Sequence, residues 1–221
     1  MPTVAAVYTA MSVIPSIQAL FSEILPDVRL INIADSSLIE DITAAGAVTP
    51  AVTRRLVAYW QAAAQTGADV ILNTCSSTGE LVALGAEMLD VPLIQIDHAM
   101  AELAVRHSGA SIGVLATLPT SLGPIVRLLA RKAEEAGTQV RIVQGVAEGA
   151  YEALAGGRSE EHDQRILAAA QRLVGQVDVF VLTQASMGRM QGALAAHTNR
   201  PVLTSPRLGV MAVARALGRE A

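Results

Sequence analysis

The only cysteine of the chain, Cys75, lies where an apolar run ends in small polar residues, within the segment Asp69 to Gly79. A thiol can act as a nucleophile, or it can give and take a proton. Backbone N–H groups and the start of a following helix are expected to lower its pKa from about 8.5 toward neutrality. The alternative is an inert cysteine in the core, where this residue type is commonly found. The neighbouring hydroxyls favour a reactive thiol.

A second segment, Asp178 to Gly188, repeats the first at a constant offset of 109 residues. Both segments begin with Asp-Val and end with glycine, and threonine and serine recur at equivalent positions. The offset places Gln184 opposite Cys75. We therefore expect one α/β unit to be present twice, with the thiol and the amide facing a common cleft.

Small polar residues also follow the ends of other expected strands, where their hydroxyls and the turn amides can bind a carboxylate without a cationic side chain. Each residue taken alone could equally be a helix cap or a turn residue. Asn73 could orient either the Cys75 loop or the substrate. The candidate substrate-binding residues are Thr9, Asn73, Ser76, Ser77, Thr117, Thr120, Ser186 and Ser205.

His98, which follows Asp97, could act as a base for the thiol, although a histidine at a helix start is often a cap. The sequence contains no phosphate-binding glycine motif and no metal-ligand spacing. We therefore expect neither a cofactor nor a metal ion.

Apolar runs and helical periodicity alternate along the chain. The expected strands are Thr3–Tyr8, Val28–Ile33, Ala68–Asn73 and Val91–Ile96, then Ser111–Leu115, Val140–Val143, Val177–Leu182 and Pro201–Thr204. The expected helices are a first one ending at Leu25, then Thr49–Thr66, Thr78–Leu89, His98–His107, Leu122–Gly137, Asp163–Gln176, Met187–His197 and Leu208–Leu217. Such alternation predicts parallel sheets, whose binding sites lie beyond the carboxyl ends of the strands.

The fold class predicted is α/β, with two similar three-layer α/β/α units, each with a parallel four-stranded sheet. The first domain is expected to comprise residues 1–97 and 207–221, and the second residues 98–206. The segments Ser36 to Val48 and Gly145 to Arg158 are expected to be loops that shape substrate recognition.

The composition limits the class of protein. Hydrophobic residues make up 52% of the 221 residues and charged residues only 16%, which excludes a disordered chain and favours a homo-oligomer. The net charge of −4 argues against nucleic-acid binding. A single cysteine and the lack of a long apolar run predict a cytoplasmic protein that does not enter membranes.

Five short segments carry a resemblance to a known family. They are Val7–Ala10, Asn73–Ser77, Leu115–Thr120, Leu182–Met187 and Pro201–Pro206. On these segments the chain resembles the Asp/Glu/hydantoin racemase superfamily, over nearly its whole length. The resemblance implies two similar α/β domains with the active site between them, and chemistry on a small carboxylate without a cofactor.

In racemases of this family one cysteine in each loop faces the substrate. The resemblance gives Cys75 the first place, whereas Gln184 replaces the second cysteine, and an amide is neither a useful acid nor a useful base. The family also includes decarboxylases that use one thiol and isomerases of unsaturated diacids. We therefore expect a racemase-type isomerase, or else a decarboxylase, with Cys75 in proton transfer or addition and Gln184 orienting a carboxylate or carbonyl. The alternatives are a non-catalytic carboxylate-binding protein and a cysteine-dependent hydrolase that uses His98.

Overall fold

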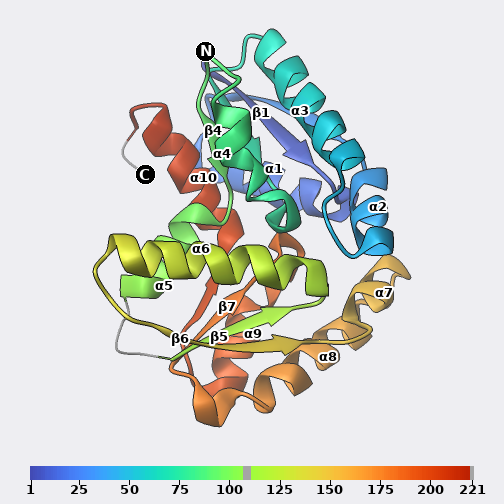
Figure 1. Ribbon diagram of the computed structural model, residues 1–221, viewed down its shortest axis with the longest axis vertical. Helices are drawn as coiled ribbons and strands as arrows, with labels where there is room; N and C mark the ends of the chain where they lie inside the picture. Colours follow the sequence, from blue (N-terminus) through green and yellow to red (C-terminus); the bar gives the residue numbers. More distant parts are fainter. Residues whose placement is uncertain (107–110, 220–221) are drawn as a thin grey trace. The chain divides into compact units, whose positions relative to one another are not determined.

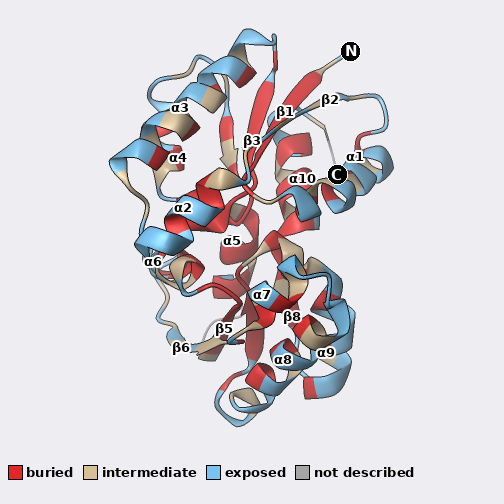
Figure 2. Cartoon of the chain, turned by 90° about the vertical axis from the view of Figure 1, so that its right-hand side faces the viewer, coloured by how far each residue is buried: buried red, intermediate tan, exposed pale blue. Residues whose placement is uncertain are grey.

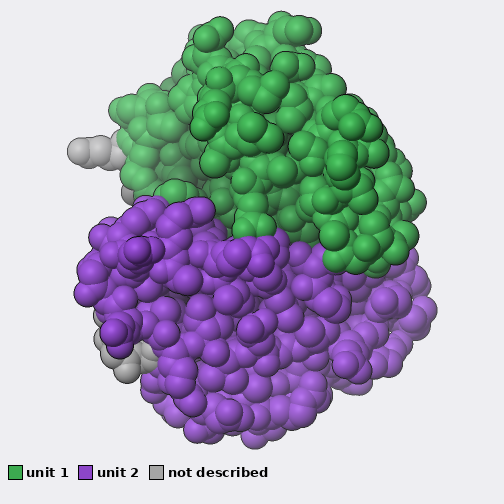
Figure 3. Space-filling model, viewed as in Figure 1, with its two compact units in different colours: residues 1–99, 206–221 green, residues 100–205 purple. Residues whose placement is uncertain are grey.

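The computed structural model describes residues 1–106 and 111–219. The chain forms two compact units, coloured separately in Figure 3. Unit 1 comprises Met1–Ala99 together with Pro206–Ala221, and unit 2 comprises Met100–Ser205. Within the described residues, no helix is both long enough and apolar enough to cross a membrane.

Unit 1 contains a parallel sheet with the strand order β2-β1-β3-β4 (Figure 1). Its strands are β1 (Thr3–Tyr8), β2 (Arg29–Ala34), β3 (Val70–Asn73) and β4 (Leu93–Gln95). The four strands predicted from the apolar runs are confirmed, since each observed strand begins and ends within two residues of the expected one. β1 and β3 are buried throughout, as expected for the central strands of a sheet covered on both faces.

Helices cover both faces of this sheet (Figures 1 and 2). The apolar sides of α2, α3 and α4 pack around Trp60, together with Leu56 and Ile71. The helices α1 and α10 lie on the other side (Figure 2). The helical elements of unit 1 are η1 (Met11–Val13), α1 (Ile14–Ile24), α2 (Ser37–Ala45), α3 (Pro50–Gln65), η2 (Ser76–Thr78), α4 (Leu81–Ala86) and α10 (Ser205–Ala216), where η denotes a 3-10 helix.

Unit 2 repeats this arrangement, with the strand order β6-β5-β7-β8 and all strands parallel. The strands are β5 (Ser111–Ala116), β6 (Arg141–Val146), β7 (Val179–Leu182) and β8 (Val202–Thr204). The helical elements are α5 (His98–Arg106), η3 (Pro119–Ser121), α6 (Leu122–Glu135), α7 (Ala150–Ala155), α8 (Ser159–Gln171), η4 (Val174–Gln176), η5 (Ala185–Met190) and α9 (Gln191–Thr198). The predicted end of α5 at His107 lies outside the described residues.

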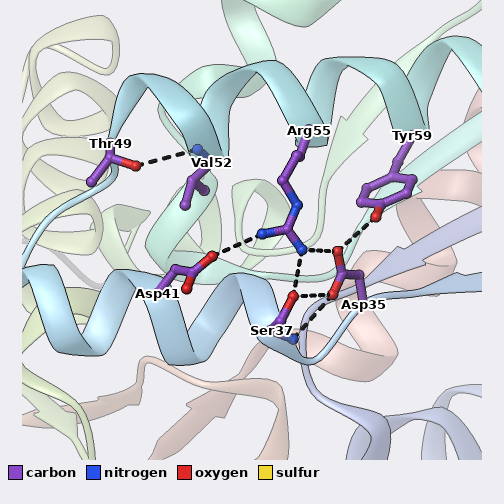
Figure 4. Close-up of polar contacts among 7 residues, drawn as sticks. All are labelled: Asp35, Ser37, Asp41, Thr49, Val52, Arg55 and Tyr59. Carbon is purple, nitrogen blue, oxygen red and sulfur yellow. Dashed lines mark hydrogen bonds and ion pairs between the residues drawn. The ribbon is translucent and has the colours of Figure 1, made fainter.

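The expected loop from Ser36 to Val48 is wrong, because most of it forms α2. Asp35 stabilises the start of this helix by accepting hydrogen bonds from the backbone N–H and the hydroxyl of Ser37 (Figure 4). Arg55 and Tyr59 from α3 bind the same carboxylate. A helix of nine residues is too short for its apolar periodicity to be recognised in the sequence, and it is stabilised mainly by tertiary contacts.

Other segments also differ from the sequence prediction. The expected loop from Gly145 to Arg158 contains α7, and α8 begins at Ser159 rather than at the expected Asp163. The helix expected from Thr78 to Leu89 is shorter, because residues 76–78 form the 3-10 turn η2 before α4 starts at Leu81. This turn follows directly after Cys75.

Candidate active site

The strand register of unit 1 brings Thr9 beside Cys75. Val7 of β1 pairs with Asn73 of β3, so the chain leaves the sheet two residues later at Thr9 and at Cys75. The hydroxyl of Thr74 donates a hydrogen bond to the carbonyl of Val7 over 2.9 Å, which ties the two strand ends together. Both candidate residues therefore lie at the carboxyl edge of the sheet, where parallel α/β folds place their sites.

The surroundings of the Cys75 thiol act on its pKa in opposite directions. Burial raises the pKa, since Cys75 is only 7% exposed, and this effect is the largest. Hydrogen bonds from the hydroxyls of Thr9 and Thr78 and from the backbone N–H groups of Ser77 and Thr78 lower it. Burial prevails, so the pKa lies above its ordinary value. The expectation of a lowered pKa is therefore wrong for this structure, and the group is a neutral thiol at pH 7.

The loop that carries Cys75 is held by two fully buried side chains. The amide nitrogen of Asn73 donates to the carbonyl oxygen of Cys75 over 3.1 Å, and to the hydroxyl of Thr78 over 3.3 Å. The hydroxyl of Thr78 also reaches the carbonyl of Cys75 over 3.1 Å. Asn73 thus orients the loop. Thr78 contacts the thiol, although the sequence predicted it only as the start of a helix. Its position three residues after Cys75 is the sequence signal for a turn in which its hydroxyl bonds back to the chain.

Ser76 and Ser77 directly follow the thiol and are both buried. The hydroxyl of Ser76 donates to Asp97, over 3.0 Å to the Oδ1 atom, and Asp97 is itself fully buried at the end of β4. Sequence reasoning noted Asp97 after a strand but gave it no place in the site. The carboxyl edge of unit 1 therefore joins residues from three strands around one thiol.

Unit 2 repeats the register with different chemistry. Leu115 of β5 pairs with Leu182 of β7, and two residues later the chain reaches Thr117 and Gln184. The backbone N–H of Thr117 donates to Oε1 of Gln184 over 2.6 Å. The Nε2 atom of Gln184 donates to the Thr117 hydroxyl over 2.8 Å. The pair Thr117–Gln184 is thus the counterpart of the pair Thr9–Cys75.

The remaining candidates lie at the same edge of unit 2 or just after it. Thr120 is on η3 and Ser186 on η5, both partly exposed, whereas Ser205 follows β8 and is fully buried. The hydroxyl of Thr183 lies 2.8 Å from that of Ser121 and supports the base of the Gln184 loop. Among the described residues, no group of three or more His, Cys, Asp or Glu side chains could hold a metal ion.

The structure thus collects Thr9, Asn73, Ser76 and Ser77 around Cys75 in unit 1. It collects Thr117 with Gln184 in unit 2, with Thr120, Ser186 and Ser205 on the neighbouring strand ends. That the two groups face one cleft stays a prediction.

A comparison with protein families finds a match to the family described as Asp/Glu/Hydantoin racemase, over residues 6–213. No curated protein sequence matches the chain.

Several solved structures share the fold. Glutamate racemase isoform RacE1 from Bacillus anthracis is similar with a TM-score of 0.77 at 12% identity, over 98% of this chain and 82% of that one. The aspartate racemase of Picrophilus torridus is similar with a TM-score of 0.77 at 14% identity, over 100% of this chain and 96% of that one. An unliganded arylmalonate decarboxylase is similar with a TM-score of 0.58 at 15% identity, over 100% of this chain and 95% of that one. These likenesses establish that the two parallel sheets and their helices form the racemase fold.

Proposed function

The chain belongs to the Asp/Glu/hydantoin racemase family, and we propose that it is a cofactor-independent, racemase-type isomerase. It acts at the carbon next to the carboxylate of a small carboxylic or amino acid. The observation that carries this proposal is the Cys75 thiol at the carboxyl end of β3, with hydroxyl and amide donors from Thr9, Ser77 and Thr78 directed at its sulfur.

The chemical problem is the negative charge that develops on the substrate when its carbon gains or loses a proton. Fixed hydrogen-bond donors stabilise such an enediolate, each by about 3 kcal/mol. We assign this role to the hydroxyls and turn amides at the two carboxyl edges, and proton transfer or addition to carbon to Cys75. The substrate-binding set is Thr9, Asn73, Ser76, Ser77, Thr117, Thr120, Ser186 and Ser205.

A second candidate activity is decarboxylation, and the protonation state of the thiol favours it. The raised pKa of Cys75 keeps the proton on sulfur, which suits a donor better than a base. When one of two carboxylates on the same carbon leaves as CO2, the electron pair of the broken carbon–carbon bond stays as an enediolate of the remaining carboxylate. Cys75 would then give its proton to that carbon, and water would restore the thiol.

Hydrolysis through an acyl-enzyme has less support. It needs a base that activates the thiol, and His98 is the residue that the sequence offers. The partners recorded for the Cys75 sulfur within the described residues are hydroxyls and backbone N–H groups. A protein that binds a carboxylate without chemistry is the remaining alternative, and the following experiment separates it from an enzyme.

The test is hydrogen exchange in heavy water, followed by proton NMR, for the small mono- and dicarboxylates that raise the melting temperature. A ligand at about 100 times its dissociation constant adds ~2.7 kcal/mol of stability. The wild type should introduce deuterium at the carbon next to the carboxylate, or release CO2. Cys75→Ser should still bind the ligand but lose turnover by at least about a hundredfold.

The control is Thr198→Ser, which keeps a buried hydroxyl bound to Leu194 at the end of α9. This variant should match the wild type in turnover. Cys75→Ser with full activity would remove the thiol from the mechanism. Binding without exchange or CO2 release in the wild type would identify a binding protein.

A further inference from the structure

Thr117 contacts both polar atoms of the Gln184 carboxamide, and the hydroxyl of Thr183 also donates to the carboxamide oxygen, over 3.3 Å. The same oxygen accepts the backbone N–H of Thr117 over 2.6 Å, and the carboxamide nitrogen donates to the Thr117 hydroxyl over 2.8 Å. Gln184 lies just past the end of β7, and Thr117 just past the end of β5. The two contacts form a closed ring across the carboxyl edge of unit 2.

The donor pair on Thr117 is not specific for an amide. A carboxylate is planar and carries two polar atoms on one carbon, as a carboxamide does, and a threonine hydroxyl can donate as readily as it accepts. The N–H and the hydroxyl of Thr117 could therefore hold both oxygens of a carboxylate in the place of Gln184. Thr117 is only 5% exposed, so leaving these groups without a partner would be unfavourable.

We propose that Thr117 forms a subsite for a carboxylate or primary carboxamide, and that Gln184 fills this subsite from within the chain. A second carboxylate on the substrate then finds the subsite occupied, which for the isomerase proposed above selects substrates with a single carboxylate. The subsite itself is independent of the proposed function. The statement about substrate choice rests on that function.

The equivalent place in unit 1 is different. The Thr9 hydroxyl contacts the thiol of Cys75, a side chain with one heavy atom beyond its Cβ, where glutamine has four. A thiol lacks the second polar atom needed to engage a backbone N–H and a hydroxyl together. Within the proposed function, the donors around Cys75 are therefore the ones available to the carboxylate next to the reacting carbon, whereas Thr117 binds a substrate group only in the place of the Gln184 amide.

The test removes the occupant and supplies it again as a free molecule. Gln184→Ala deletes four heavy atoms, and acetamide has four heavy atoms with the same connectivity, while acetate is its charged isostere. Binding of both probes would be measured by ligand-observed NMR and by thermal shift. The variant should bind acetamide and acetate at least about tenfold more tightly than the wild type does, as expected for two hydrogen bonds in a buried site.

The control is the double variant Gln184→Ala with Thr117→Val, which keeps the N–H and the approximate size of residue 117 but removes its hydroxyl. The gain in affinity should fall by about tenfold. Equal probe binding by the wild type and Gln184→Ala would overturn the proposal. Equal binding by the single and double variants would also overturn it.

Gln184→Glu gives a readout that needs no added probe. Thr117 should hold the new carboxylate, so the variant should melt close to the wild-type temperature at pH 7, and the glutamate should titrate below its ordinary pKa of about 4.3. A glutamate that titrates above that value would contradict the subsite.

Substrate choice is tested last, as the ratio of kcat/KM for a dicarboxylate to that for the monocarboxylate of the same chain length. The ratio should rise at least about tenfold in Gln184→Ala. An unchanged ratio, with probe binding gained, would overturn selection by Gln184 and leave the subsite standing. Wild-type protein that turns over neither compound would count against the proposed function, while the probes would still decide the subsite.

Discussion

The chemistry of the Cys75 thiol depends on a balance between burial and hydrogen bonding. Burial favours the neutral form, whereas the hydroxyls of Thr9 and Thr78 favour the thiolate. Because burial prevails, the ligand-free protein holds its proton on sulfur near pH 7. A neutral thiol can protonate a carbanion directly. To remove a proton from the substrate, the thiol must first lose its own proton to a base.

We therefore predict that alkylation of Cys75 by iodoacetamide, measured against pH without ligand, gives an apparent pKa above the ordinary range of about 8.5 to 9. Thr9→Val should raise it further, because the variant removes a hydroxyl that favours the thiolate. A titration centred below pH 8 would show that the loop amides outweigh burial.

The same shift affects stability. A thiol whose folded pKa is raised stabilises the fold fully below the unfolded pKa, and this contribution is lost as pH rises toward the folded value. Relative to Cys75→Ser, the wild type should lose unfolding free energy above about pH 9. Urea denaturation at pH 7 and at pH 10 measures the difference in unfolding free energy between the wild type and Cys75→Ser, which should fall at the higher pH. An unchanged difference would show that the thiol has the same pKa in the folded and unfolded protein.

At the scale of the element, the helix α2 depends on contacts with α3. Burial raises the pKa of Asp35, but hydrogen bonds from Ser37, Tyr59 and Arg55 outweigh it and lower the pKa to about 2. Figure 4 shows these side chains converging on one carboxylate that ends β2 and starts α2. The backbone N–H of Asp35 also donates to the carbonyl of Tyr8, over 3.0 Å, directly before Thr9.

Asp35→Asn should therefore lower the unfolding free energy at pH 7 by about 1 to 2 kcal/mol, less than the full shift implies because Arg55 is partly exposed to solvent. A group with a lowered folded pKa stabilises above its unfolded value of about 4, so the difference should shrink as pH falls toward 2. The control is Asp41→Asn, an exposed partner of Arg55 that should cost under about 0.5 kcal/mol. Equal effects of the two variants in urea denaturation would contradict this account.

A second element depends on close packing. In α4 a Cβ on Gly85 would lie 2.4 Å from Cζ3 of Trp60, which is fully buried on α3. Gly85→Ala should therefore lower the unfolding free energy by about 1 to 3 kcal/mol.

The same change in α9 is the matched control. A Cβ on Gly192 meets no heavy atom within 4 Å, so Gly192→Ala should stabilise by about 0.5 to 1 kcal/mol. Opposite signs in chemical denaturation are the expected outcome. A neutral Gly85→Ala would mean that α4 moves away from Trp60 at little cost.

At the scale of the whole molecule, two units with the same strand order and register carry different chemistry at equivalent positions. Racemisation requires proton transfer on both faces of a carbon, and unit 2 presents the Gln184 amide where unit 1 presents a thiol. If the chemistry uses one face of the carbon, deuterium from heavy water should enter the reacting carbon with a single configuration, whereas a racemase that works on both faces would scramble it.

Gln184→Cys should introduce or raise racemisation of a chiral carboxylate that the wild type binds. The substitution releases Thr117, whose hydroxyl can then contact the new thiol as Thr9 contacts Cys75. The gain is limited by alignment, because an error of ~1 Å can cost about a hundredfold. Chiral chromatography of the product decides the matter. A wild type that already racemises at the rate of the variant would show that another group serves the second face.

The sequence alone determined the duplicated α/β architecture, because buried parallel strands need continuous apolar runs and these recur at one offset from Asp69 and from Asp178. It also identified Cys75 and Gln184 as equivalent positions. Local patterns specify such features, since each strand and its following turn are read within about ten residues.

Only the tertiary structure decided the state of these side chains. Burial of Cys75 comes from strands and loops distant in sequence, so its raised pKa could not be read from the neighbouring residues. The Thr117–Gln184 ring joins residues 67 positions apart through the pairing of β5 with β7. The helix α2 likewise needed Arg55 and Tyr59 from α3. Desolvation and long-range hydrogen bonds depend on what surrounds a group in space, which the order of residues does not state.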